Sequence, residues 1–358
     1  MNSRERLLAA LRRQPVDRVP WAPLFDHYFT SSLPADQPLD VPGALRAVGA
    51  DILERHVPAM RTLHRDVVMT ERQDGNEILR TIETPLGVLH ERRLVTPVTT
   101  FIAEPLIKSV TDFGPYRYWV EHTEYVPDYE AFLAEDARIG ADGLATVSGP
   151  QSPVQFLIGE DMGVERFTYA LYDYPAELSA LVEAMHEKYK EAYRLLARSP
   201  ALVVIGYEDV STSTASPAIY QRFTLRYLDD YADIVHAEGK LYLTHMCGLL
   251  KGVASLIARG RMDGIDSVTP PTTGNMPVDE ARAAWPDKVI IGGLEPKSLA
   301  MLHVDEVRAY TRDVLCRAAP GDGFILSTGD ATAHGTPLEN LRAVTEVVQA
   351  YGRFPLAC

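Results

Sequence analysis

The chain alternates short runs of β-branched and other apolar residues with longer stretches whose apolar residues recur at helical spacing. Eight such runs end in small or polar residues, and they begin at Val19, Asp51, Leu144, Leu202, Lys240, Asp263, Lys288 and Gly323. The clearest predicted helices cover 175–198, 217–237, 304–318 and 337–350, with Ser216 and Thr336 as N-caps of the second and fourth. Eight strands with helical crossovers favour an α/β fold of the closed (β/α)8 TIM barrel type. An open doubly wound sheet is the alternative, but no G-x-G-x-x-G pattern follows the first run.

The length of 358 residues fits one barrel with insertions, because such barrels run from about 200 to 400 residues. We expect a single domain over 1–358. The alternation breaks in 66–125, where short strands surround the turn-like segments QDGN (73–76) and ETPLG (83–87), so we predict a β-rich insertion there, at the barrel mouth. The first helix has Leu7, Leu8 and Leu11 on one face, and we expect it to close the bottom of the barrel or to pack on a second subunit of a homodimer.

The charge balance restricts the partners of the chain. There are 35 Lys and Arg against 49 Asp and Glu side chains, a formal net charge of −14. Such a surface repels phosphate backbones and anionic lipid, so we expect neither nucleic acid nor a membrane as a partner. No run approaches ~20 apolar residues, and the opening residues lack a signal-peptide core. We therefore expect a cytoplasmic protein that acts on a small-molecule substrate.

The predicted strands end in many polar side chains. In a barrel of this type the reactive groups project from the C-terminal strand ends, so these residues are the candidates for the site. We predict catalytic carboxylates at Asp26, Glu208 and Asp209, and substrate-binding side chains at His27, His56, Ser148, Gln151, Thr269 and Glu295. For each acid a structural role stays open, because it could instead cap a helix or bind backbone amides.

His245 and Cys247, in LYLTHMCG, are the most informative pair. Residues two apart in a strand point the same way, so an imidazole and a thiolate at this spacing can bind one metal ion, and zinc accepts such nitrogen and sulfur ligands. Asp330 and His334, at the end of the last predicted strand and in the loop after it, are the candidates for a further ligand. A buried histidine beside a small apolar cysteine is the structural alternative.

Six segments resemble the uroporphyrinogen decarboxylase superfamily in their order along the chain: RERLLAALRRQPVDRVPW, SGPQSPVQFLIG, EDVSTSTASPAIYQRF, LTHMCG, GGLEP and STGDATAHGTPLENL. The resemblance covers almost the whole chain and implies a (β/α)8 barrel with its active site in a cleft at the strand C-termini. The superfamily contains uroporphyrinogen decarboxylases and zinc-dependent methyltransferases that move methyl groups between corrinoids, thiols and pterins.

The chain is more similar to the methyltransferase branch. The decarboxylases have an arginine-rich R-Q-A-G-R segment after the first strand for the substrate carboxylates, and this chain has FDHYF at 25–29 instead. The methyltransferases bind zinc through H-x-C and a later cysteine. His245 and Cys247 match the first two ligands, and Asp330 stands at the position of the third.

The resemblance implies a methyltransferase in which His245, Cys247 and Asp330 hold Zn²⁺. The methyl carrier would be a separate corrinoid protein or a pterin such as tetrahydrofolate, because the chain has no D-x-H-x-x-G cobalamin module. Two alternatives remain at this point. One is a metal-free lyase or decarboxylase in which a strand-end carboxylate such as Asp26 stabilises a positively charged substrate, and the other is a non-catalytic ligand-binding barrel.

Overall fold

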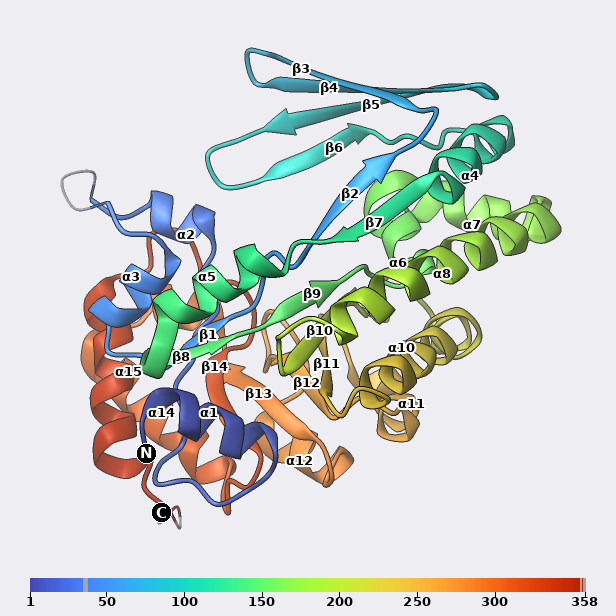
Figure 1. Ribbon diagram of the computed structural model, residues 1–358. Coiled ribbons are helices and arrows are strands. Elements are labelled where there is room, and N and C mark those ends of the chain that lie inside the picture. The colour runs from blue at the N-terminus through green and yellow to red at the C-terminus, as the bar shows by residue number, and fades with distance from the viewer. Residues whose placement is uncertain (35–37, 355, 357–358) are drawn as a thin grey trace.

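The computed structural model describes residues 1–34, 38–354 and 356. Parallel strands surrounded by helices form its lower part, and an antiparallel sheet projects from the strand ends at its upper part (Figure 1). No helix in the described residues is both long and apolar enough to cross a membrane.

The barrel is built from parallel strands joined by helical crossovers. Six strands pair in chain order in one sheet, and β1 pairs in parallel with β8, the segment just before β9. The first segment of the chain completes the ring, because Trp21 bridges to Leu326 and its carbonyl accepts a hydrogen bond from the Asp51 N–H. The barrel strands are β1 (Ile52–Glu54), β8 (Gly143–Ala145), β9 (Val147–Gly149), β10 (Val203–Asp209), β11 (Leu241–Cys247), β12 (Gly264–Val268), β13 (Val289–Leu294) and β14 (Phe324–Thr328). The TIM barrel prediction is confirmed.

The first predicted strand, which starts at Val19, does not form a regular strand. The segment from Val19 forms only the isolated bridge at Trp21. Pro20 and Pro23 lie in this segment, and neither has an N–H for a strand ladder. The segment therefore joins the ring through a few hydrogen bonds.

Helices cover the outside of the barrel, and the four clearest predicted helices are confirmed. Ser216 caps its helix by accepting a hydrogen bond from the Ile219 N–H at 3.3 Å. Thr336 is not a cap. The helix begins at Leu338 with Pro337 at the N-cap position, and the Thr336 hydroxyl donates to the Ala333 carbonyl. The covering helices are α2 (His27–Ser31), α3 (Val41–Ala47), α5 (Tyr129–Ile139), α6 (Pro153–Phe156), α7 (Val164–Asp173), α8 (Pro175–Ala197), α9 (Pro217–Ile219), α10 (Arg226–His236), α11 (Ala254–Arg259), α12 (Val278–Ala284), α13 (Pro296–Met301), α14 (Val304–Arg317) and α15 (Leu338–Tyr351).

Helix α1 (Ser3–Leu11) closes the bottom of the barrel, as one of the two predictions for it stated. Leu7 and Leu11 are buried in a cluster with inward-facing strand residues such as Val203 and Ile205. This cluster fills the lower barrel, so the reactive groups are left to the opposite end.

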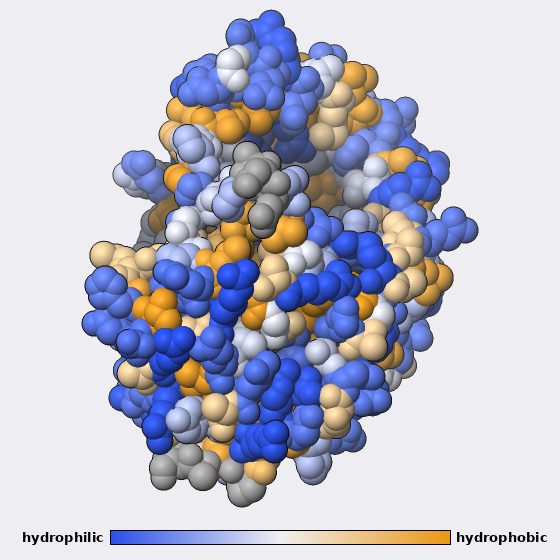
Figure 2. Space-filling model, turned by 90° about the vertical axis from the view of Figure 1, so that its left-hand side faces the viewer, coloured by the Kyte–Doolittle hydropathy of each residue, from blue (hydrophilic) through white to orange (hydrophobic). Residues whose placement is uncertain are grey.

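The insertion leaves the barrel after β1 and returns before α5. β2 (Met60–His64) and β7 (Thr123–Pro127) pair in antiparallel fashion and carry the rest of it. Beyond them lie β3 (Val68–Asp74), β4 (Glu77–Thr84), β5 (Gly87–Val95) and β6 (Thr100–Glu104) in one antiparallel sheet, followed by α4 (Phe113–Glu121). Figure 2 shows this sheet as an upper lobe with a hydrophilic outer surface. The four-stranded sheet lies within the predicted range 66–125, whereas β2 precedes that range and β7 extends past its end.

Candidate functional site

Three stacked rings line the upper end of the barrel. The Tyr207 ring lies between those of His56 and His245, with centroid distances of 4.5 and 4.8 Å. The parallel register of β10 and β11 places Tyr207 opposite His245, and His56 follows the end of β1. The Tyr207 hydroxyl is buried and has no hydrogen-bond partner among the described residues. Burial raises the pKa of Tyr207 and the nearby Ser148 opposes this rise, so the hydroxyl is a candidate donor to a ligand in the barrel mouth.

A buried ion pair fixes the orientation of His245. The Arg55 guanidinium donates to both carboxylate oxygens of Asp266, at 3.0 and 3.2 Å. His245 Nδ1 lies 3.1 Å from Asp266 Oδ2. Burial alone would raise the pKa of Asp266, but the Arg55 cation and the His245 contact hold it well below its usual range. An ionised carboxylate only accepts, so Nδ1 carries a proton, and Nε2 is the ring nitrogen left to face another group.

Cys247 lies beside two carboxylates. Its register partner on β10 is Asp209, which is exposed, and Asp330 approaches from the loop after β14. Burial and the charges of Asp330 and Asp209 raise the pKa of the Cys247 thiol. Asp330 Oδ1 lies 4.0 Å from His245 Nε2, and burial raises the pKa of the Asp330 carboxyl. The predicted residues His245, Cys247, Asp209 and Asp330 are thus neighbours.

Ser148 determines the tautomer of His56. Its hydroxyl donates to the Arg55 carbonyl at 2.6 Å, so His56 Nδ1, 3.1 Å from Ser148 Oγ, is the donor in that second contact. Part of the His56 ring is exposed, but desolvation, the Arg55 cation and His245 lower its pKa to about 4. The ring is therefore neutral near pH 7, and its Nε2 is a hydrogen-bond acceptor.

Glu208 lies outside this group of side chains. Residues alternate along a strand, so Glu208 points away from the barrel interior that Tyr207 and Asp209 face. Its carboxylate oxygens lie 2.6 Å from the Ser152 N–H and 2.7 Å from the Ser152 hydroxyl. Burial raises the pKa of Glu208 to about 8. The side chain connects β10 to the start of α6 and does not reach the mouth.

The other predicted residues have mainly structural contacts. Asp26 caps α2 by accepting from the Phe29 N–H at 2.8 Å, and Glu295 caps α13 by accepting from the Ser298 N–H at 2.6 Å. Thr269 is buried and donates to backbone carbonyls. His27 is exposed with its ring tilted against that of Tyr28, His334 is exposed in the loop after β14, and Gln151 is half-buried before α6. The structure gives His27, Gln151 and His334 no hydrogen bond or ion pair among the described side chains.

Arg55 and Tyr207 belong to the site but were not among the residues predicted from sequence. Both could have been found from strand alternation. Tyr207 has the inward parity of Ile205, and Arg55 has the inward parity of Leu53. Arg55 directly follows β1, next to His56. The sequence gives no sign that the Arg55 side chain reaches Asp266 on the far side of the barrel, since that contact spans 211 residues.

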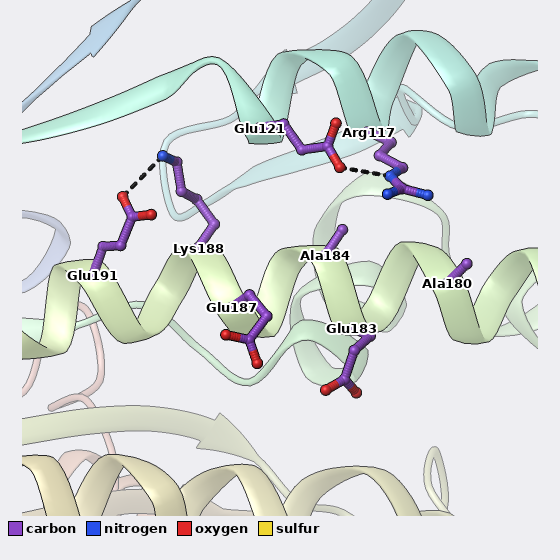
Figure 3. Close-up of a pocket in the computed structure, with 8 residues that line it drawn as sticks. All are labelled: Arg117, Glu121, Ala180, Glu183, Ala184, Glu187, Lys188 and Glu191. Carbon is purple, nitrogen blue, oxygen red and sulfur yellow. Dashed lines mark hydrogen bonds and ion pairs between the residues drawn. The ribbon is translucent and has the colours of Figure 1, made fainter.

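Two hollows are lined by residues other than the rings and carboxylates described above. A groove of about 490 Å³ runs between α4 and α8, and its basic side chains are paired: Arg117 with Glu121 at 2.7 Å and Lys188 with Glu191 at 2.8 Å (Figure 3). These charges are satisfied within the groove. The second hollow, of about 430 Å³, lies between the insertion and the barrel and includes Ser148.

Comparison with known proteins places the chain in a family. The model of the family "Uroporphyrinogen decarboxylase (URO-D)" matches residues 108–351, more than half of the chain. The chain belongs to the uroporphyrinogen decarboxylase family. This confirms the resemblance predicted from the sequence segments. The family match begins after β6, so the antiparallel sheet of the insertion precedes it.

Two known proteins are similar to this URO-D protein, one in sequence and one in fold. A uroporphyrinogen decarboxylase from Anaeromyxobacter dehalogenans (strain 2CP-C) is 27% identical over 223 residues, and the match covers 58% of this chain and 58% of the relative. A solved methyltransferase structure from Methanosarcina mazei is similar with a TM-score of 0.66 and 16% identity, over 98% of this chain and 99% of that chain. At 16% identity this second likeness concerns the fold.

The donor types at the barrel mouth of this URO-D protein suit zinc, but their spacing is wide. Imidazole nitrogen, thiol sulfur and carboxylate oxygen are all zinc ligands, with metal bonds of about 2.0 to 2.3 Å. Among residues 1–34, 38–354 and 356, no three His, Cys, Asp or Glu side chains form a ready-made metal site. Zinc would therefore have to draw His245, Cys247 and Asp330 closer together.

Proposed function

We propose that this URO-D protein is a methyltransferase that uses zinc held by His245, Cys247 and Asp330. The observation that supports it most is the alignment of His245 and Cys247 on one face of β11, with Asp330 Oδ1 4.0 Å from His245 Nε2. The 25–29 segment supports the same choice, because it contains no arginine to bind a substrate with many carboxylates.

The surroundings of His245 suit a metal ligand. Metal-binding histidines commonly donate their second ring N–H to a carboxylate, which fixes the ring and makes the other nitrogen a better ligand. Asp266 has this position toward His245 Nδ1. Arg55 in turn keeps Asp266 ionised. The buried Arg55–Asp266 pair therefore fixes the orientation of the His245 ring and so the direction of Nε2.

The chemistry at Cys247 also suits a cation. Two nearby carboxylates disfavour the thiolate, and a bound divalent cation would reverse that balance. When bound, zinc would act as a Lewis acid on a thiol acceptor or on the heteroatom that carries the methyl group.

The protein's own side chains would position the reactants. In methyl transfer the bond from carbon to the donor heteroatom breaks, the new bond to the acceptor forms, and the electron pair of the broken bond stays on the heteroatom. The Tyr207 hydroxyl has no partner in the described structure and would donate a hydrogen bond to that heteroatom. His56 Nε2 would accept a hydrogen bond from the substrate. We further propose a separate corrinoid protein or tetrahydrofolate as the methyl carrier.

Metal analysis of the purified protein tests the zinc proposal. We expect about one zinc per chain, lost in His245→Ala and Cys247→Ser and reduced in Asp330→Asn. His236→Ala is the matched control, because His236 pairs with Asp263 at 2.9 Å on a different part of the chain, and this variant should keep its zinc. Full zinc content in all variants, or no zinc in wild-type protein after incubation with the metal, would contradict the proposal. The second outcome would favour the metal-free lyase.

A further inference from the structure

The hollow between the insertion and the barrel has aromatic walls. It has a volume of about 430 Å³, within the range of small-molecule sites. β2 and β7 form one side of it, and β4, the end of β9, α4, α6 and α8 contribute the rest. Its aromatic lining consists of Tyr116, Trp119, Tyr125, Phe156 and Tyr189. Such walls favour a flat ligand that stacks on them.

Arg80 gives this pocket a largely uncommitted cation. Its side chain is 19% exposed, and its guanidinium carbon lies 5.2 Å from the centre of the Trp119 ring. Its ion pair with Glu91 is long, at 3.8 Å, and Glu91 accepts two shorter hydrogen bonds from Arg93. Within the described residues the Arg80 guanidinium has no hydrogen bond, although its charge also acts on the buried Asp161 carboxyl. A guanidinium in this condition matches the two oxygens of a carboxylate.

Further donors face the same hollow. His64 Nδ1 accepts a hydrogen bond from Trp119 Nε1 at 3.2 Å, so the proton of the neutral ring is on Nε2. Tyr125 and Tyr189 line the pocket, and the described structure gives neither hydroxyl a hydrogen-bond partner. These groups suit the oxygen substituents of an aromatic ring.

We propose that this pocket binds a flat aromatic carboxylate, with Arg80 pairing the carboxylate and Trp119 and Tyr125 contacting the ring. The pocket is next to the barrel mouth, because Ser148 lines it and also contacts His56 at 3.1 Å. His64 and Arg80 precede residue 108, where the URO-D match begins, so the pocket belongs partly to the insertion of this chain. The inference rests on the proposed function in one respect, because it identifies the bound aromatic carboxylate as the methyl donor.

Binding without turnover tests the pocket. Calorimetric titration of the full chain would compare 4-methoxybenzoate with 4-methoxybenzamide, which lacks the charge, and with cyclohexanecarboxylate, which lacks the aromatic ring. We expect 4-methoxybenzoate to bind at least about tenfold more tightly than either. Folic acid is a fourth probe, because it also combines aromatic rings with carboxylates. Tighter binding of folic acid than of 4-methoxybenzoate would assign the pocket to a pterin carrier, and would overturn its assignment to the methyl donor.

Arg80→Gln should weaken 4-methoxybenzoate binding at least about tenfold, and Arg80→Lys should weaken it less. Arg61→Gln is the matched control. Arg61 lies on β2 with the parity opposite to Met60, Thr62 and His64, and its side chain is 66% exposed. Unchanged affinity in Arg80→Gln, equal affinity for the benzamide, or no binding of any probe would overturn the proposal. If Arg80→Gln does not fold, the benzamide comparison and Arg80→Lys decide.

The two proposals can fail separately. These titrations are done in the presence of a chelator, so they do not depend on zinc. If 4-methoxybenzoate binds through Arg80 but zinc does not bind at His245 and Cys247, the pocket stands and the zinc methyltransferase proposal fails. If zinc binds at His245 and Cys247 but the probes do not bind, the reverse holds.

Discussion

Arg55 Nε lies 3.0 Å from Asp266 Oδ2, and both side chains are almost wholly buried, with 1% and 2% of their surface exposed. The two residues come from β-strand ends on different sides of the barrel, after β1 and on β12. Asp266 also contacts His245 Nδ1, so the pair supports the imidazole that we propose as a metal ligand. Its breakage should therefore affect both stability and metal binding.

Removing one partner of this pair should destabilise the protein strongly. We expect Arg55→Met and Asp266→Asn each to lower the free energy of unfolding by about 3 to 5 kcal/mol, because each leaves a buried partner without its counter-charge. The double variant should lose less than the sum of the two. Urea denaturation measures all three. Arg61→Gln, which breaks an exposed ion pair, should change the free energy by no more than about 1 kcal/mol. Additive losses would show that the two side chains do not interact.

Tyr207→Phe should separate stability from activity. The hydroxyl is buried without a partner among the described residues, so its removal should leave the free energy of unfolding unchanged or raise it slightly. If this hydroxyl contacts the leaving heteroatom, turnover should fall at least about tenfold. Steady-state kinetics and thermal unfolding of the same preparation measure both effects. Full turnover in Tyr207→Phe would remove the hydroxyl from the mechanism.

The barrel could be predicted from the sequence because its signal is periodic and local. Buried parallel strands such as β11 and β13 are short apolar runs, and the helices between them have their own spacing. The first strand was the exception, since two prolines reduce it to a bridge. Its apolar composition resembles a strand, but composition does not show which N–H groups are missing.

The candidate site was only partly predictable. The H-x-C spacing indicated that His245 and Cys247 share a face, because that depends on one strand alone. Glu208 was predicted with Asp209, although neighbours in a strand must face opposite ways. The pocket that contains Arg80 could not be predicted, because it depends on how β2, β4, β7, α4 and α8 pack together, and no local pattern records such contacts.

Closure of the barrel bottom by α1 can be tested with a pair of leucines. Leu11→Ala should lower the free energy of unfolding by about 2 to 5 kcal/mol, because Leu11 is 2% exposed and the cavity lies inside the barrel. Leu8→Ala is the control, since Leu8 is on the same helix but only partly buried against the same cluster. Chemical denaturation should give a clearly smaller loss for Leu8→Ala. Equal losses would mean that α1 does not use one face to close the barrel.

The Glu208 carboxyl should make stability depend on pH. Its pKa is raised to about 8 in the folded chain by burial, against about 4.5 in the unfolded chain. Between these values the folded state keeps a proton that the unfolded state has lost, so the free energy of unfolding should fall as the pH rises, by about 1.4 kcal/mol per pH unit at most. The stabilisation is complete below about pH 4.5 and is lost as the pH passes about 8.

Glu208→Gln removes this titration and preserves the shape of the side chain. The amide oxygen can still accept from the Ser152 N–H, and the amide nitrogen can donate to the Ser152 hydroxyl, which now contact the two carboxylate oxygens. Other groups titrate equally in both proteins, so the quantity to compare is the slope of unfolding free energy against pH. Urea denaturation from about pH 5 to about pH 8 should give a steeper fall for the wild-type protein than for Glu208→Gln. Parallel slopes would mean that Glu208 is already ionised in the folded state, with its charge stabilised by the two hydrogen bonds from Ser152.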